Sequence, residues 1–121
     1  MILVLVVIFG LFLVAGLAGM TRTLIKAGKF PAGVAFGLRT PNTGRSDEAW
    51  IAGHQAAAGA LTLTMIVSSL GGAAVYLTSL FATAGAASSS TWLVAGLSVL
   101  ATVVMIGIAF LIANGAAAKT A

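Results

Sequence analysis

Three long apolar runs, separated by one charged loop and one short polar connector, constrain this chain more than any other feature. The runs cover about residues 1–21, 56–83 and 92–113, and nearly all ionic side chains lie in the loop 22–55. Hydrophobic residues make up 60% of the 121 residues and charged residues only 7%, whereas a soluble domain carries about 25% charged residues. Six basic and two acidic side chains cannot cover a soluble domain of this size, so the sequence predicts a membrane protein.

Each run is long enough to cross a bilayer as a helix. With a rise of 1.5 Å per residue the runs would measure about 31, 42 and 33 Å, against a hydrocarbon core of roughly 30 Å. In lipid only a helix satisfies every backbone group within its own segment. We therefore predict an all-α membrane protein with three transmembrane helices in a single domain, 1–121, and with Gly71-Gly72 as the most favourable place for a kink in the second helix.

The first run has an alternative interpretation as a signal peptide, because Ala15-Gly16-Leu17-Ala18 resembles a small-residue cleavage site. It lacks a basic n-region, so we expect it to be retained. Orientation follows from the basic residues: five of the six lie in the loop 22–55, Lys119 follows the third run, and the connector 84–91 has none. Basic residues stay cytoplasmic. We therefore predict a multi-pass membrane protein with the N-terminus outside and the C-terminus cytoplasmic.

The segment 36–54 differs from the rest of the chain. Pro41, Asn42 and Gly44 favour turns. Ser46 is a favourable helix N-cap and is followed by two acidic residues, so a helix is predicted to start there and continue into the second span. Trp50 and His54, four residues apart, would share one face of that helix.

The charges around this helix start allow two interpretations. Ion pairs of Arg39 and Arg45 with Asp47 and Glu48 are one expectation. The other is a pocket for an anionic lipid headgroup, formed where the two arginines meet the N-terminus of the helix.

The same segment resembles the signature of the SdpI family of small bacterial membrane proteins. In that family a Gly-x-Arg-Thr element and a Thr precede a Ser-x-Glu-x-Trp helix start, with His or Asn shortly after the Trp, and the order of spans and loop is similar. The resemblance implies an integral protein of a bacterial inner (plasma) membrane with a cytoplasmic signature loop, acting in toxin immunity or signal relay. The residues expected to carry the family motif and to contact a partner or lipid are Gly37, Arg39, Thr40, Pro41, Thr43, Arg45, Ser46, Glu48, Trp50 and His54.

Catalysis, cofactors and metals find little support in the residues. His54 is the only histidine; paired with Ser46 it lacks a recognisable orienting group. Asp47, Glu48 and His54 would be three metal ligands, but neighbouring helical residues point apart. Residues 28–33 are not a Walker A loop, since Val34 stands where the Lys belongs. Spans one and three contain no ionisable side chain, which argues against a channel or pump, and the basic loop lacks the density of a nucleic-acid site.

We therefore expect a non-enzymatic binding protein with no cofactor and no nucleic-acid partner. Its expected partners are membrane lipids and a protein that contacts the loop 36–54 at the cytoplasmic face or within the membrane. The alternative is a small accessory subunit of a larger respiratory or envelope-export complex. Small residues at Ala15 and Gly19, and at Ala52, Ala56 and Ala60, permit close helix packing, either inside the three-helix bundle or in a homo-oligomer or hetero-complex.

Overall fold

The computed structural model describes residues 2–28, 37–81 and 89–120. It contains three long helices and one short one: α1 (Ile2–Lys26), the 3₁₀ helix η1 (Thr43–Arg45), α2 (Asp47–Leu80) and α3 (Ser89–Ala118). All three long helices are long and apolar enough to cross a membrane, so the prediction of an all-α protein with three membrane-spanning helices is confirmed.

The helices extend beyond the apolar runs, chiefly at the end where the loop lies. α1 continues to Lys26 and α2 begins at Asp47, about nine residues before the second apolar run. With 34 residues, α2 would measure about 51 Å, so its first turns lie outside a hydrocarbon core of roughly 30 Å. α2 continues through Gly71 and Gly72 without interruption.

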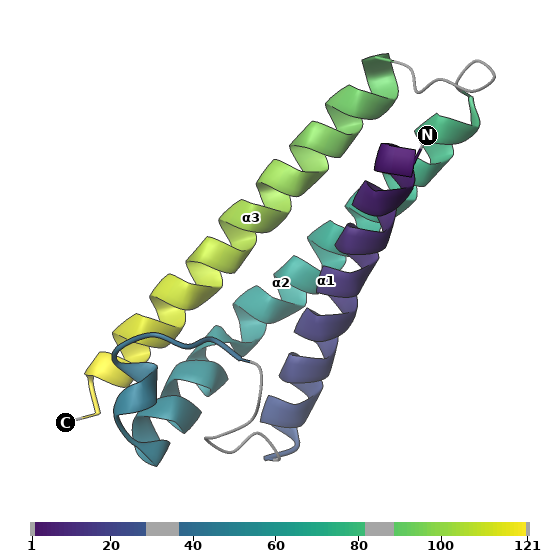
Figure 1. Cartoon of the computed structure of the whole chain (residues 1–121). Coiled ribbons are helices and arrows are strands. Elements are labelled where there is room, and N and C mark those ends of the chain that lie inside the picture. The colour runs from purple at the N-terminus through teal and green to yellow at the C-terminus, as the bar shows by residue number, and fades with distance from the viewer. Residues whose placement is uncertain (1, 29–36, 82–88, 121) are drawn as a thin grey trace.

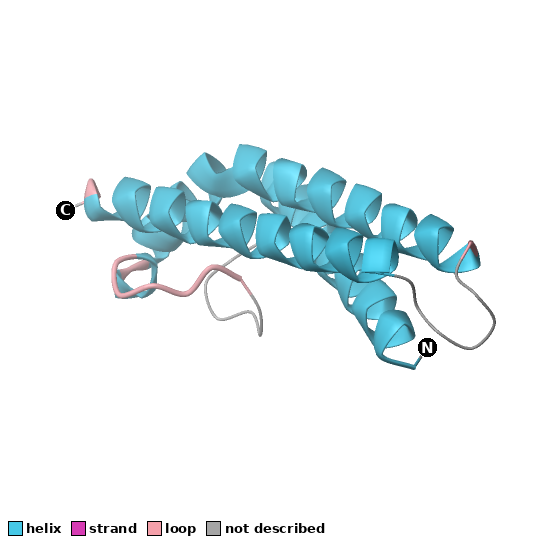
Figure 2. Ribbon diagram, turned by 90° about the horizontal axis from the view of Figure 1, so that it is seen from above, coloured by secondary structure: helices cyan, strands magenta, loops and turns pink. Residues whose placement is uncertain are grey.

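Helix α2 is the central element of the bundle. It packs along both α1 and α3, whereas α1 and α3 contact each other little (Figure 1). α2 and α3 run antiparallel, as predicted for a hairpin (Figures 1 and 2). The predicted turn at 84–91 falls mostly outside the described residues. The C-terminus, the start of α2 and the end of α1 all lie at the same end of the bundle, called the loop end below (Figure 1).

Small side chains form most of the core. Alanines of all three helices are buried around Leu61, while many large apolar side chains, Phe9 and Leu111 among them, are exposed on the outside, where lipid would surround them. Ala15 is buried, and a Cβ at Gly19 would lie 2.7 Å from the sulfur of Met65. The predicted packing face on the first helix is thus confirmed as a contact within the bundle.

The glycine pair of α2 serves the same close packing. A Cβ at Gly71 would lie 2.7 Å from Cβ of Ser98 on α3, and one at Gly72 would lie 2.9 Å from the ring of Phe12 on α1. One turn away, the hydroxyls of Ser68 and Thr102 lie 3.5 Å apart in a buried contact between α2 and α3. Close approach to both neighbours is therefore what these two glycines provide.

Candidate functional site

The segment from Gly37 to Ser46 folds back onto the start of α2 and the end of α3 (Figure 1). It runs from a bend at Gly37 through residues without regular structure to a turn at Pro41-Asn42, and then into η1. The amide of Gly44 donates to the carbonyl of Thr40 across this turn, at 3.1 Å. The predicted turn is confirmed, and it returns the chain to the helix that follows.

His54 anchors the first residues of this segment. The amide of Leu38 donates to Nε2 of His54 at 2.8 Å, and Nδ1 lies 2.8 Å from the carbonyl oxygen of Trp50. Since Nε2 accepts, the geometry assigns the neutral tautomer that carries its proton on Nδ1 and donates it to Trp50. His54 is only 1% exposed, so the imidazole acts as a buried bridge between the loop backbone and α2.

Gly37 is required by the closeness of this bridge. Its φ is +132°, a backbone conformation that residues other than glycine rarely adopt. A Cβ there would also lie 3.0 Å from Nε2 of His54 and from the indole of Trp50. The first glycine of the motif is thus explained by conformation and by space together.

Two threonines form a reciprocal pair in the turn. The Thr40 amide donates to Oγ1 of Thr43 at 2.8 Å, and the Thr43 amide donates to Oγ1 of Thr40 at 3.1 Å. The Thr43 hydroxyl donates to the carbonyl of Leu38 at 2.8 Å, and Thr43 is fully buried. These hydrogen bonds satisfy the amides of Thr40 and Thr43 and the carbonyl of Leu38 within the loop, which stabilises its shape.

The helix start is the one that the sequence predicts. Ser46 is the N-cap of α2, and its Oγ accepts from the amide of Ala49 at 3.0 Å. Asp47 and Glu48 occupy the first turn, where negative charge suits the helix dipole. Both carboxylates are exposed.

Trp50 and His54 share a face of α2, as their spacing predicts. Their ring centroids are 4.1 Å apart with planes inclined by 36°. On the indole ring of Trp50 lies the guanidinium of Arg39, 5.2 Å from the ring centroid, in the range of a cation–π contact. The buried aromatic residue therefore fixes the position of an exposed cation.

Contacts with the end of α3 were not predicted. The Asn42 amide donates to Oδ1 of Asn114 at 3.4 Å, and Nδ2 of Asn42 donates to the Asn114 carbonyl at 3.4 Å. Gly53 allows α3 to lie close to the start of α2, since a Cβ there would lie 2.8 Å from the carbonyl oxygen of Ala113. The signal for Asn114 was present: it is the only polar side chain between residues 103 and 118.

Arg45 also reaches α3. Its Nη2 donates to the carbonyls of Ala117 at 3.2 Å and Thr120 at 2.6 Å. These are carbonyls at a helix C-terminus, where a cation is favoured. Arg45 thus donates to backbone carbonyls, and in the described part of the chain it forms no ion pair with the carboxylate of Asp47 or Glu48.

The structure divides the predicted motif into two groups. Gly37, Thr40, Thr43, Ser46, Trp50 and His54 build the loop through the contacts above, whereas Arg39, Pro41, Arg45 and Glu48 are exposed. Arg39 and Arg45 line one hollow of about 300 Å³, together with Ser46, Asp47 and Trp50. Both arginines thus border a hollow beside the start of α2, with Asp47 also in its lining, and the predicted headgroup pocket stays a prediction.

The chemical capacity of this site lies in its shape and charge. Each ring nitrogen of His54 has a backbone partner, and the Ser46 hydroxyl caps α2, so neither side chain is placed to activate the other. Within the described ranges, no three His, Cys, Asp or Glu side chains gather into a group that could hold a metal ion. A rigid loop that presents a cation beside a small polar hollow suits recognition.

Comparison with protein-family models, with curated proteins and with solved structures finds no match to this chain. The site and its folded loop are therefore interpreted from their own geometry.

Proposed function

We propose that this chain is a non-enzymatic binding protein of the SdpI type, in which the exposed face of the 36–54 loop docks a protein partner at the cytoplasmic side of a bacterial inner membrane. The observation that carries the proposal is the placement of Arg39. Its guanidinium lies over the ring of Trp50, which is buried, on a loop whose backbone is hydrogen-bonded to His54 and Thr43.

Preorganisation supports a docking role. A loop that is already ordered has little conformational entropy left to lose when a partner binds. The loop is attached to α2 through His54 and to α3 through Asn42 and Arg45. Arg39 and Pro41 are motif residues with exposed side chains, which a partner can reach on the outer face of the loop.

The arrangement of charge supports the orientation. Arg22, Lys26, Arg39 and Arg45 all belong to the loop end, and Lys119 follows α3 at that same end (Figure 1). Basic residues are retained on the cytoplasmic side. We therefore place the loop and the C-terminus in the cytoplasm and the start of α1 outside.

The test is co-purification from the native membrane in mild detergent, with a tagged chain and two single variants. Arg39→Ala removes the exposed cation of the docking face. Lys119→Ala removes a basic residue at the same end of the bundle, outside the loop, and is the matched control. A partner that is recovered with the native chain and with Lys119→Ala, but lost with Arg39→Ala, supports the proposal.

The other outcomes separate the remaining interpretations. A complex of fixed stoichiometry that survives Arg39→Ala would be held through the membrane helices and would favour an accessory subunit of a respiratory or envelope-export assembly. Toxin immunity has its own test: deletion should sensitise cells to a secreted peptide toxin, and complementation with Arg39→Ala should fail where Lys119→Ala succeeds.

A further inference from the structure

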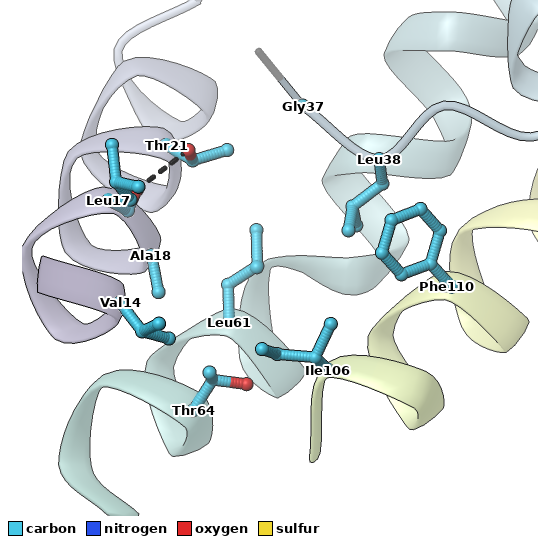
Figure 3. A pocket seen from close by; sticks show the side chains of 10 residues that line it. All are labelled: Val14, Leu17, Ala18, Thr21, Gly37, Leu38, Leu61, Thr64, Ile106 and Phe110. Carbon is cyan, nitrogen blue, oxygen red and sulfur yellow. Dashed lines mark hydrogen bonds between the residues drawn. The ribbon is translucent and has the colours of Figure 1, made fainter. Parts of the chain in front are cut away.

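An apolar trough runs between α1 and α3, on the side where these two helices barely touch. It consists of two neighbouring hollows, of about 220 and 250 Å³, which share Val14 and Ile106 as lining residues. Along α1 the lining runs from Val7 to Thr21, a length of about 21 Å at the helical rise. Leu61 and Thr64 of α2 form its floor (Figure 3).

The walls of the trough offer hydrocarbon and few polar groups. Thr21, Thr64 and Thr102 line it. The Thr21 hydroxyl donates to the carbonyl of Leu17 and the Thr64 hydroxyl to that of Ala60, each at 2.8 Å, and the Thr102 hydroxyl lies 3.5 Å from that of Ser68. A polar ligand would leave its own groups unpaired there, which is costly. The occupant that suits these walls is aliphatic.

The trough is open at its side and closed at one end. Leu17 and Val103, which line it, are 44% and 59% exposed, so a chain can enter laterally from the bilayer. At the loop end Gly37 and Leu38 lie over it (Figure 3). Leu38 is 5% exposed and its backbone is held by His54 and Thr43.

The size of the trough favours a single flexible chain over a helix. A helix about 10 Å across and 21 Å long would fill on the order of 1,600 Å³, far more than the two hollows of about 220 and 250 Å³. A spanning helix would also meet the loop at the closed end. An acyl chain is thin enough to lie within the walls and ends inside the bilayer.

Cations adjoin the closed end. Arg22 directly follows Thr21, and its Nε donates to Oγ1 of Thr62 on α2 at 2.7 Å; Lys26 lies about one turn further along α1. Clusters of basic residues at a membrane surface attract anionic lipid headgroups. The apolar walls thus match the acyl chain of an anionic phospholipid, and the basic residues at the end match its negatively charged headgroup.

We propose that the α1–α3 trough holds an acyl chain of an anionic phospholipid, with the headgroup beside Arg22 and Lys26. This site is separate from the docking face proposed above, since it uses the membrane-embedded walls of α1 and α3. Its failure would leave the docking proposal standing, and the reverse also holds.

The test is native mass spectrometry of the protein taken from vesicles of phosphatidylglycerol and phosphatidylcholine, with two matched pairs of variants. Gly10→Leu and Gly16→Leu both add a side chain where nothing lies within 4 Å of the new Cβ, but only Gly10 lines the trough. Val103→Phe and Val104→Phe form the same comparison on α3, where both residues are exposed and only Val103 lines the trough.

We expect the native chain to retain phosphatidylglycerol in preference to phosphatidylcholine. Gly10→Leu and Val103→Phe should lower retention about tenfold, as displacing about two buried methylene groups would, while Gly16→Leu and Val104→Phe retain it. Lys26→Gln should reduce the preference for the anionic lipid. Equal retention within each pair, or of both lipids by the native chain, would overturn the proposal.

A second measurement identifies a protein occupant. The chain has no cysteine, so Gly10→Cys introduces a single thiol into the trough. Oxidative crosslinking in the native membrane should leave this variant monomeric if lipid fills the trough. A disulfide-linked dimer, or a crosslink to another protein that Gly16→Cys does not form, would show that a helix lies there and would contradict the lipid site.

Discussion

At the scale of single residues, the loop depends on positions that leave no room for a side chain. A Cβ at Gly53 would lie 2.8 Å from the carbonyl oxygen of Ala113 and 2.8 Å from Cγ2 of Thr43. The first neighbour is backbone, which cannot rotate away. Gly53 therefore lets the start of α2, the buried threonine of the loop and the end of α3 meet at one point.

We predict that Gly53→Ala destabilises the protein by about 1–3 kcal/mol, because the added methyl forces α3 or the loop to move. Gly59→Ala is the control: nothing lies within 4 Å of that Cβ, and alanine favours a helix over glycine. Thermal unfolding in detergent should show a lower transition for Gly53→Ala only. Equal transitions for the two variants would contradict the close contact.

His54→Ala should loosen the loop. Without the imidazole the buried amide of Leu38 loses its acceptor, at a cost of about 1–3 kcal/mol. Hydrogen exchange followed by mass spectrometry should show faster exchange in a peptide covering 37–46. Gln55→Ala, at an exposed neighbouring position, should leave that exchange rate unchanged; if both variants exchange alike, His54 does not hold the loop.

At the scale of the elements, the start of α2 sets where the loop ends. Ser46 caps the helix through the amide of Ala49, and the first turn then places Trp50 beneath Arg39. The helix continues for 34 residues, longer than the bilayer requires. One continuous helix thus both carries the residue that Arg39 lies over and is long and apolar enough to span a membrane.

Ser46→Ala should cost about 1 kcal/mol of stability, the usual effect of losing an N-cap side chain. Ser46→Asp should preserve stability, because aspartate caps equally well and suits the helix dipole. Hydrogen exchange in a peptide covering 46–52 distinguishes the two variants. Fraying of the first turn in both, or in neither, would show that capping does not determine this boundary.

At the scale of the whole molecule, the two ends of the bundle differ in charge. The loop end carries the basic residues and the folded loop, and the opposite end carries the start of α3 at Ser89. This asymmetry makes orientation testable with single cysteines, since the chain has none. Thr43 is fully buried, so the exposed Glu48 is the better reporter for the loop.

In intact cells, a cysteine introduced by Ser89→Cys should react with an impermeant thiol reagent, whereas one introduced by Glu48→Cys should react only after permeabilisation. The expected pattern follows from the retention of basic residues in the cytoplasm. The control is labelling of both variants in detergent, where each should react. The opposite pattern in cells would invert the proposed topology.

Much of the architecture could be predicted from sequence because it depends on local physics. Lipid allows each apolar run only a helix, and Ser46 with two following acidic residues specifies a helix start. The shared face of Trp50 and His54 follows from helical periodicity. Such statements need only neighbours along the chain.

The partners of these residues could not be predicted, because they come from far along the chain. Asn42 and Asn114 are 72 residues apart, as are Arg45 and Ala117, and no periodicity relates them. The uneven packing of the three helices decides where the apolar trough lies. In this packing Gly71 lies close to α3 and Gly72 lies close to α1. From the sequence alone, the two glycines predicted only a place for a kink.

By itself, then, the sequence determined the membrane class, the three helices and the start of α2, since each follows from hydropathy, periodicity or capping over a few turns. Only the tertiary structure decided which motif residues hold the loop against the helices and which face outwards. Gly37, Thr43 and His54 hold the loop in place because the loop folds against α2 within hydrogen-bonding distance. Arg39 became an exposed cation held in place because Trp50 is buried beneath it.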